Sequence, residues 1–327
     1  MLRLDKYLID NFFTSFFTLF MILFVIASMV LLLTISNMTA VLKIDIWEFL
    51  YLYILSLPEI IFYTLPLTFF ITAALSIAKL FENSELITVL ALGVSPKKII
   101  QPFIKIAIFI TFLLFIITFF SIPTSNILFK NFINIKKTES QFNFTPSSIG
   151  QKFGDWHIFI KNKNKNLYND LILYNNQKNL LIYAQKASTF RKDNYFILSL
   201  SDGTLYNNNN QKYLKVDFRK MDLNQKISIT QLSFNSIADY LKKYIKKTNK
   251  YFLISLFPLI SLLFLANISF FHNRYQKNNS VIYSLIISIS YYISVFIMFK
   301  KLYAIFIIIP IFIIISKIID KKRIKQF

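Results

Sequence analysis

The stretch FFTSFFTLFMILFVIASMVLLLTI, residues 12–35, decides the fold of this chain because it holds 24 residues without a charge. A helix of about 20 apolar residues crosses the roughly 30 Å hydrocarbon core of a membrane. Inside lipid the backbone must satisfy its own hydrogen bonds, which a helix does within one segment. The stretch is too long for the core of a signal peptide, and Leu31–Thr34 offers no small-residue cleavage site. It therefore predicts a retained transmembrane helix.

Five further apolar runs flank a long polar block. Two precede the block and three follow it: Ile54–Leu80, Ile99–Ile122, Tyr251–Phe271, Val281–Phe299 and Leu302–Ile319. This order predicts a membrane α-helical fold with six transmembrane helices, three before and three after an inserted soluble domain. We place the domain limits at residues 1–122, 123–249 and 250–327.

The composition excludes both an ordinary soluble protein and a disordered one. Of the 327 residues, 55% are hydrophobic, and the mean hydropathy is +0.51. Since cysteine is absent, disulfides, thiol catalysis and cysteine metal sites are excluded. The net charge of +21 fits either solubility of the polar block or affinity for anionic lipid headgroups, and nucleic acid is not an expected partner.

Basic residues beside the apolar runs predict orientation, because short cytoplasmic loops are enriched in Lys and Arg. With a cytoplasmic N-terminus, 13 basic residues flank the inner ends of the runs and 3 lie in the short outer loops. The inner residues are Arg3, Lys6, Lys79, Lys97, Lys98, Lys105, Arg274, Lys277, Lys317, Lys321, Lys322, Arg323 and Lys325, and the outer ones are Lys43, Lys300 and Lys301. We therefore expect both termini inside and the polar block outside.

Short runs rich in Ile, Leu, Tyr and Phe predict strands within the polar block. They are Trp156–Lys161, Leu167–Tyr174, Leu180–Thr189, Tyr195–Leu200 and Tyr213–Phe218, with turn signals at Lys192–Asn194, Ser201–Gly203 and Asn207–Asn210. The spacing is typical of a sandwich, a jelly roll or an open barrel. The first helical periodicity in the block comes at Ser233–Lys247, as a stripe of Ile237, Tyr240, Leu241, Tyr244 and Ile245.

The loop between the second and third apolar runs predicts a short helix at the inner membrane surface, at about residues 83–93. Its parts are a cap, an acidic first turn, an apolar face and a closing glycine, namely Ser84, Glu85, Leu86, Val89, Leu90 and Gly93. Asn83 is an alternative cap, and Ser95-Pro96 predicts the start of the next helix. From these residues alone, the helix is either a plain interfacial connector or a docking helix for a cytoplasmic partner.

Motifs for catalysis or ligand binding are almost absent. The four glycines, at positions 93, 150, 154 and 203, form no phosphate-binding loop. The two histidines, His157 and His272, lack the spacing of metal ligands. We therefore predict no catalytic residue, no metal site and no bound cofactor.

Glu59 is the carboxylate inside an apolar run, about one turn from the outer end. Carboxylates within a membrane segment are functional candidates by default. A carboxylate this close to the interface can also simply reach headgroups or water. Glu59 is therefore a candidate structural or substrate-gate residue.

Several short motifs, taken together, point to a family. They are Leu4-Asp5-Lys6-Tyr7, Leu57-Pro58-Glu59, Leu65-Pro66-Leu67, Ser84-Glu85-Leu86 and Ala91-x-Gly93-x-Ser95. In combination they resemble the lipopolysaccharide export permeases, the paired F and G subunits of the Lpt transporter. The resemblance extends to the whole layout of three spans, a β domain and three spans, and Leu57-Pro58-Glu59 favours the F subunit.

The resemblance implies a permease subunit of an ABC transporter in the bacterial inner membrane, with a periplasmic, all-β, jelly-roll-like domain. Such a subunit extracts lipopolysaccharide from the inner membrane and passes it through its β domain toward the outer membrane. The implied partners are a second permease (F with G), a cytoplasmic ATPase dimer (B), a single-span periplasmic protein (C) and a periplasmic bridge protein (A). The partner ATPase, not this chain, would bind and hydrolyse ATP.

The resemblance also assigns roles to particular residues. Glu85 matches the acidic position of the ATPase-docking helix, with Leu86, Val89, Leu90 and Gly93 as its supports. Relatives often carry basic residues near the outer end of helix one, whereas here Ser28–Leu42 contains none. The first is Lys43, which together with Glu59 is a candidate lipid or gate contact. The alternatives to this function are a membrane-anchored periplasmic scaffold and a permease for another lipid.

Overall fold

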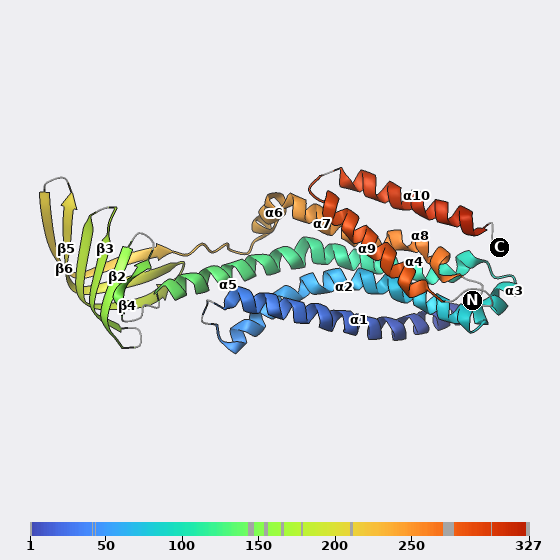
Figure 1. The fold of residues 1–327 in the computed structure, drawn as a ribbon, viewed down its shortest axis with the longest axis horizontal. Helices are drawn as coiled ribbons and strands as arrows, with labels where there is room; N and C mark the ends of the chain where they lie inside the picture. Colours follow the sequence, from blue (N-terminus) through green and yellow to red (C-terminus); the bar gives the residue numbers. More distant parts are fainter. Residues whose placement is uncertain are drawn as a thin grey trace. The chain divides into compact units, whose positions relative to one another are not determined.

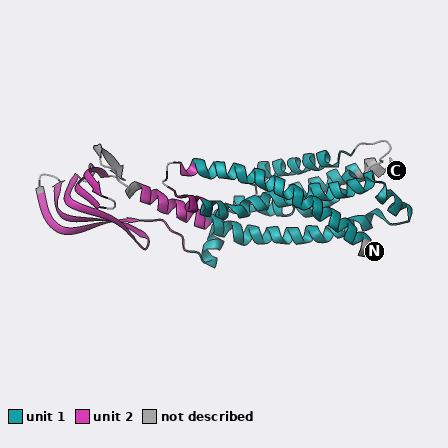
Figure 2. Cartoon of the chain, turned by 90° about the horizontal axis from the view of Figure 1, so that it is seen from below, with its two compact units in different colours: residues 1–37, 50–126, 232–327 teal, residues 38–49, 127–231 magenta. Residues whose placement is uncertain are grey.

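The computed structural model describes residues 2–40, 42, 44–142, 147–153, 156–164, 167–177, 179–209, 212–270, 278–301 and 303–324. Figure 1 gives the order of the helices and strands along the chain. The chain divides into two compact units, coloured in Figure 2. The first, the membrane unit, comprises residues 1–37, 50–126 and 232–327, and the second, the β unit, comprises residues 38–49 and 127–231. The domain limits that the sequence analysis placed at residues 123 and 249 remain a prediction.

Ten helices of the described chain carry the labels α1 to α10. They are α1 (Leu2–Thr39), α2 (Ile46–Glu82), α3 (Glu85–Ala91), α4 (Pro96–Ile116), α5 (Ile122–Phe142), α6 (Phe234–Lys243), α7 (Ile245–Ser255), α8 (Phe257–Ser269), α9 (Ser280–Met298) and α10 (Ala304–Ile324). A π-helical segment, η1 (Ile117–Ser121), joins α4 to α5.

Five described helical segments are long and apolar enough to cross a membrane. They are Leu4–Thr39, Ile46–Glu82, Pro96–Ser140, Ile245–Ser269 and Ser280–Met298. A shorter apolar helix, Ala304–Ile319, follows them. The predicted membrane-helical fold with an inserted β domain is thereby confirmed, and each predicted span coincides with one of these six segments.

Helix α2 is the centre of the membrane unit, since 78% of its apolar window is buried, against 6% for α1. It runs through Pro58 and Pro66 as one helix. Along it Thr64, Thr68 and Thr72 each donate a hydroxyl hydrogen bond to the carbonyl four residues earlier. These bonds satisfy polar groups that would otherwise be costly in an apolar core.

The third predicted span continues well beyond Ile122. Helices α4 and α5 and the π-helical segment between them form one helical run from Pro96 to Phe142. The expectation that the polar block holds no helix before Ser233 is therefore wrong. The contacts of α5 are made partly by Asn131 and Asn134, which a search for apolar periodicity does not detect.

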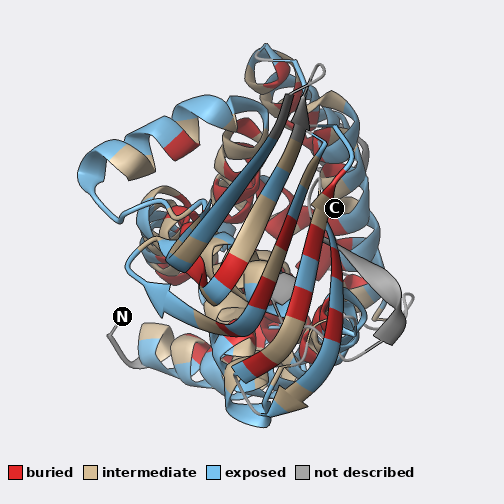
Figure 3. Cartoon of the chain, turned by 90° about the vertical axis from the view of Figure 1, so that its left-hand side faces the viewer, coloured by how far each residue is buried: buried red, intermediate tan, exposed pale blue. Residues whose placement is uncertain are grey.

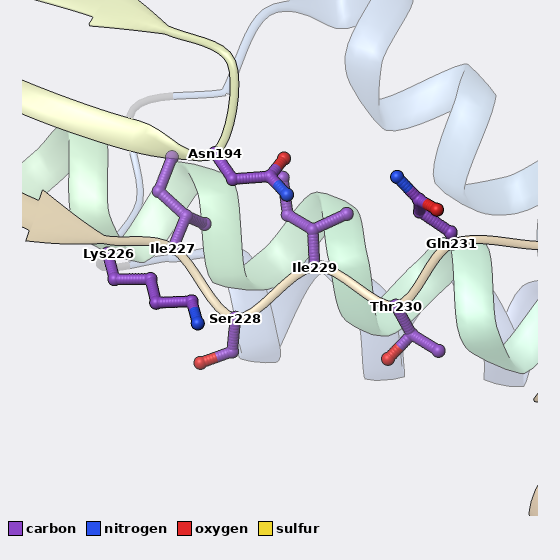
Figure 4. A pocket seen from close by; sticks show the side chains of 7 residues that line it. All are labelled: Asn194, Lys226, Ile227, Ser228, Ile229, Thr230 and Gln231. Carbon is purple, nitrogen blue, oxygen red and sulfur yellow. The ribbon is translucent and has the colours of Figure 1, made fainter.

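Two asparagines of α5 fasten an extended segment to the helix, and we call this segment, residues 227–231, the strap. The Asn131 amide donates to the Thr230 carbonyl and accepts from its N–H, while the Asn134 amide donates to the Ser228 carbonyl. Figure 4 shows the strap running along the helix, with Ile227 and Ile229 on one side and Ser228 and Thr230 on the other. The strap thus ties the end of the sheet to α5.

The β unit contains a six-stranded antiparallel sheet in which each strand pairs with its neighbours in sequence. The strands are β1 (Ser147–Phe153), β2 (Trp156–Asn164), β3 (Leu167–Asn175), β4 (Leu180–Lys192), β5 (Tyr195–Asn209) and β6 (Lys212–Lys226). All five predicted strands are confirmed, while β1 was not predicted as a separate strand. The turn at Asp193-Asn194 is confirmed, with Asp193 at φ +51°.

The predicted turn at Ser201–Gly203 is wrong, because β5 continues through it. Asp202 does have a turn-like φ of +53°, but its neighbours stay paired to both adjacent strands. Asp170 in β3 has a φ of +52°. Tracing the pairing from strand to strand places both residues in one transverse row, which we call the crease: Lys161, Asp170, Gln185, Asp202 and Arg219.

The crease changes which residues of each strand face the apolar layer. In β3 the buried residues are Leu171, Leu173 and Asn175 on one side of the crease and Tyr168 on the other, so the spacing is three at the crease and two elsewhere. In β4, Ala184 and Ala187 show the same step. Figure 3 shows the resulting pattern of buried and exposed bands along the strands. The step at the crease, which coincides with a left-handed residue in β3 and β5, therefore keeps one continuous apolar layer across the sheet.

The predicted helix at Ser233–Lys247 is present but divided. Ser233 caps α6 in a reciprocal capping box with Ser236, and the helix ends at Lys243. Tyr244, at φ −111° and ψ +34°, separates it from α7. The chain can therefore turn at Tyr244 before it enters the span.

Candidate functional site

Helix α3 corresponds to the short helix that the sequence predicts at about residues 83–93. It spans seven residues, Glu85–Ala91, and closes with Gly93 in the left-handed conformation at φ +84°, as predicted. Ser84 occupies the N-cap position, but it is itself left-handed and makes no side-chain cap hydrogen bond. The predicted side-chain capping is therefore wrong, whereas the Ser95-Pro96 start of α4 is confirmed in position.

The carboxylate of Glu85 is held by its neighbours. It accepts a hydrogen bond of 2.7 Å from the Tyr7 hydroxyl of α1 and one of 3.3 Å from the Asn83 amide. Charge-assisted bonds of this kind are about twice as strong as neutral ones. Sequence reasoning missed Tyr7, although it lies in the Leu4–Tyr7 motif that carried the resemblance.

The apolar residues of this segment divide between two faces. Leu86 is 1% exposed and belongs to the core of the membrane unit, and Leu90 packs against that core. Ile87 and Leu92, by contrast, are 41% and 79% exposed. Of the predicted face, Leu86 and Leu90 thus anchor the helix, while Ile87 and Leu92, which are left for a partner, are residues that the periodicity did not select.

Glu59 lies at the other end of the membrane unit, which we call the α6 end because α6 packs there. Its Oε1 accepts a 2.7 Å hydrogen bond from the Tyr251 hydroxyl and lies 3.8 Å from the Lys247 ammonium. Both partners are on α7, so the carboxylate links α2 to α7. This contact favours the structural interpretation of Glu59 and adds two residues that the sequence did not single out.

A buried tyrosine of α6 also belongs to this group. Burial raises the pKa of Tyr240 to about 12, and the negative charge of Glu59 contributes further to the increase. Tyr240 is 9% exposed, and its ring lies 4.7 Å from that of Tyr244. Glu59, Lys247, Tyr251 and Tyr240 therefore form one cluster across α2, α6 and α7.

The other predicted contact, Lys43, falls outside the described residues. The β unit also presents an open pocket, lined by Asn194, Lys226, Ile227, Ser228, Ile229, Thr230 and Gln231. Lys226 ends β6, Asn194 lies in the β4–β5 turn and the other five residues form the strap (Figure 4); their side chains form no arrangement typical of catalysis. Among the described residues no group of three or more His, Cys, Asp or Glu could hold a metal ion.

A comparison with protein families matches residues 6–319 to a family model described as the lipopolysaccharide export system permease LptF/LptG. The chain belongs to the LptF/LptG family. The match covers every described helix except the ends of α1 and α10, and the whole sheet. A comparison with curated proteins gives no match.

Membership in the LptF/LptG family assigns a coarse function. The family consists of permease components of the lipopolysaccharide export system, which are generally non-catalytic. With its membrane-length helices, this chain is a multi-pass inner-membrane protein. The predicted family and layout are thereby confirmed, and the Glu59 cluster and α3 lie within the matched region.

Proposed function

We propose that this LptF/LptG chain is the subunit through which a separate cytoplasmic ATPase drives extraction of lipopolysaccharide from the inner membrane. Of the two paired subunits, F is favoured. The lipid then passes along the β unit toward the outer membrane. The chain itself binds no ATP, because its sequence has no phosphate-binding loop.

The construction of α3 carries this proposal. The helix is fixed on one side by Leu86 in the core and by the Tyr7–Glu85 hydrogen bond, while Ile87 and Leu92 stay exposed. A short helix with an anchored inner face and an apolar outer face is suited to a groove on a soluble partner. Anchoring matters, because only a rigidly held helix can transmit the partner's movement to α1 and α2.

Further partners and the orientation are parts of the same proposal. They comprise a second permease of the family, an ATPase dimer, a single-span periplasmic protein and a periplasmic bridge protein. The α3 end would be cytoplasmic, together with both termini, and the β unit periplasmic. The bias of basic residues toward the predicted inner flanks supports this orientation.

Affinity purification of the tagged chain in mild detergent tests the composition of the complex. We expect a soluble ATPase, a second permease of the same layout and lipopolysaccharide to be recovered together. Recovery of the chain alone, with bulk phospholipid, would contradict the proposal and favour a scaffold. Recovery of the ATPase with a different lipid would support the transporter function but show that lipopolysaccharide is not the cargo.

Glu85→Ala tests the coupling role of α3. We expect the variant to assemble but to lose lipid-dependent stimulation of ATP hydrolysis in reconstituted vesicles. Glu85→Gln keeps an acceptor for Tyr7 and separates the role of the charge from that of the hydrogen bond. Asp10→Ala removes an exposed acid from α1 on the same unit and is the matched control. Normal stimulation in Glu85→Ala would exclude the coupling role.

A further inference from the structure

The α6 end of the membrane unit is strongly basic. The described residues of α6, α7 and the turn after α9 contain seven lysines, Lys242, Lys243, Lys246, Lys247, Lys250, Lys300 and Lys301, and one carboxylate, Asp239. The turn is held against α7 by Asn249, whose amide donates to the carbonyls of Phe299 and Lys301. Two of the lysines, Lys247 and Lys250, lie in the first turns of the span that begins at Ile245.

Lys250 is held in a cage of aromatic rings. Its ammonium lies 5.3 Å from the ring centre of Tyr63, 5.1 Å from that of Tyr251 and 4.8 Å from that of Phe296, which come from α2, α7 and α9. The side chain is partly buried. Within the described part of the chain, no carboxylate lies within ion-pair distance of it and no oxygen accepts a hydrogen bond from it. Its three N–H donors are therefore held in place and still available.

Lys247 stands one helical turn earlier on the same side of α7. Its ammonium lies 5.5 Å from the Tyr251 ring centre and 3.8 Å from Glu59 Oε1. Its side chain is 37% exposed, so this ion pair leaves part of the ammonium open to solvent. The carboxylate of Glu59 thus pairs with Lys247 and not with Lys250, and the cluster keeps a surplus positive charge.

We propose that Lys247 and Lys250 form a binding site for the phosphate group of a membrane lipid headgroup. Ammonium groups near the end of a span lie at the depth of the headgroups. Phosphate offers several acceptor oxygens, and lysine binds it as a point charge. Since the rings already restrict the Lys250 side chain, less conformational entropy is lost on binding. Partial burial also strengthens the charge interaction relative to water.

The site requires the chain to span a bilayer, but it does not require the ATPase or the transport step. The phosphate could come from the exported glycolipid or from bulk phospholipid, and the chemistry of recognition is shared. A failure of this binding-site proposal can therefore be distinguished from a failure of the proposed function, because lipid binding is measured without ATP.

The test is native mass spectrometry of the full chain, with its co-purifying subunits, in a phosphate-free maltoside detergent. Three probes are titrated: a bisphosphorylated lipid A glycolipid, its dephosphorylated form and phosphatidylglycerol. Lys247→Gln combined with Lys250→Met removes both charges and keeps a similar side-chain length. We expect affinity for the bisphosphorylated probe to fall by about tenfold or more, because each charge-assisted bond is worth about a tenfold change. Lys250→Arg should retain most of the binding.

A matched control removes two exposed lysines of α6 and α7 that lie outside the ring cage, Lys242→Gln with Lys246→Met, and should leave affinity unchanged. If the tenfold loss is seen with the glycolipid and not with phosphatidylglycerol, the phosphate belongs to the cargo. A loss with both supports the site and assigns it to headgroup phosphate in general. Unchanged affinity in the Lys247/Lys250 variant overturns the proposal, as does equally tight binding of the dephosphorylated glycolipid. If the double variant does not assemble, Lys247→Gln alone should weaken binding about tenfold, and no loss there overturns the proposal as well.

Discussion

Two glycines illustrate how a single position is constrained for different reasons. At Gly203 in β5, a Cβ atom would lie 2.2 Å from the Tyr183 carbonyl oxygen and 2.5 Å from the Phe218 ring. At Gly93 a Cβ atom would meet nothing within 4 Å, but the φ of +84° favours glycine. The first position is limited by space and the second by backbone conformation.

Asparagine separates these two reasons, because it tolerates the left-handed region but has a Cβ atom. We expect Gly93→Asn to change stability by well under 1 kcal/mol and Gly203→Asn to destabilise the sheet by about 1–3 kcal/mol. Hydrogen exchange of β5 and β6 amides, measured in the full chain, checks the second. Equal protection in both variants would contradict the steric argument.

Tyr240 gives the cluster at the α6 end a measurable pH dependence. Its pKa of about 12 lies above the ordinary value of 10.0, so the folded protein keeps the proton that the unfolded chain loses first. The stabilisation is fully present below about pH 10 and is lost as the pH rises through about 12. We expect the tyrosinate absorbance of the wild type, after subtraction of Tyr240→Phe, to show this late titration. Glu59→Gln should move it to lower pH, because the nearby negative charge is gone, and an unmoved titration would exclude that contribution.

At the scale of elements, an ion-pair network joins the start of α2 to α5 within the β unit. Lys136 lies 2.6 Å from Glu48 and 3.1 Å from Glu139, and its side chain is only 15% exposed. An ion pair with one partly buried partner is costly to break on one side. The comparable pair Lys215–Asp217 is more than half exposed.

Lys136→Met should destabilise the contact between α2 and α5 by about 1–3 kcal/mol, whereas Lys215→Met should change stability by less than about 1 kcal/mol. A double-mutant cycle with Glu48→Gln, read by hydrogen exchange in α5, isolates the pair. A coupling energy near zero would show that packing alone holds the two helices.

The crease predicts a position-specific tolerance in β5. Asp202 has a φ of +53°, which glycine adopts without strain and a β-branched residue does not. Asp202→Val should therefore destabilise the sheet by about 1–2 kcal/mol, while Asp202→Gly should be neutral or stabilising. Chemical denaturation followed by fluorescence of Trp156 in β2 reports the change. Similar midpoints for the two variants would contradict a left-handed requirement.

The crease, α5 and β1 are the parts of the fold that the sequence alone did not predict. The apolar spans and five strands are marked by runs of Ile, Leu and Phe, so they could be placed from composition and period. Helix α5 contacts the strap through hydrogen bonds of its asparagines, and β1 reads Ser-Ser-Ile-Gly-Gln-Lys-Phe, so neither has the expected apolar pattern. Their structure depends on partners distant in sequence.

The candidate sites divide in the same way. Glu85 and Glu59 could be singled out because a carboxylate is unusual in its place. Tyr7, Tyr251 and Lys247 could not, since each is ordinary in its own segment. Their role comes from contacts between residues 78, 192 and 188 positions apart, respectively.

At the scale of the whole molecule, the absence of cysteine makes the proposed orientation directly testable. Lys192→Cys places a thiol at the β4–β5 turn of the β unit, and Lys97→Cys places one at the start of α4, at the α3 end. We expect a membrane-impermeant maleimide to label the first in cells with a permeabilised outer membrane. The second should react only after the inner membrane is opened. Labelling of Lys97→Cys in intact spheroplasts would reverse the orientation.

The simple strand order of the sheet has a consequence for biosynthesis. Every strand pairs with the strand before or after it, and the β unit uses no residue beyond Gln231. Contacts that are close in sequence form early, and domains generally fold as units during synthesis. The ribosome can therefore deliver a complete β unit before α7 to α10 have been translated. In the proposed orientation, the last spans are then inserted behind a domain that has already folded on the far side of the membrane.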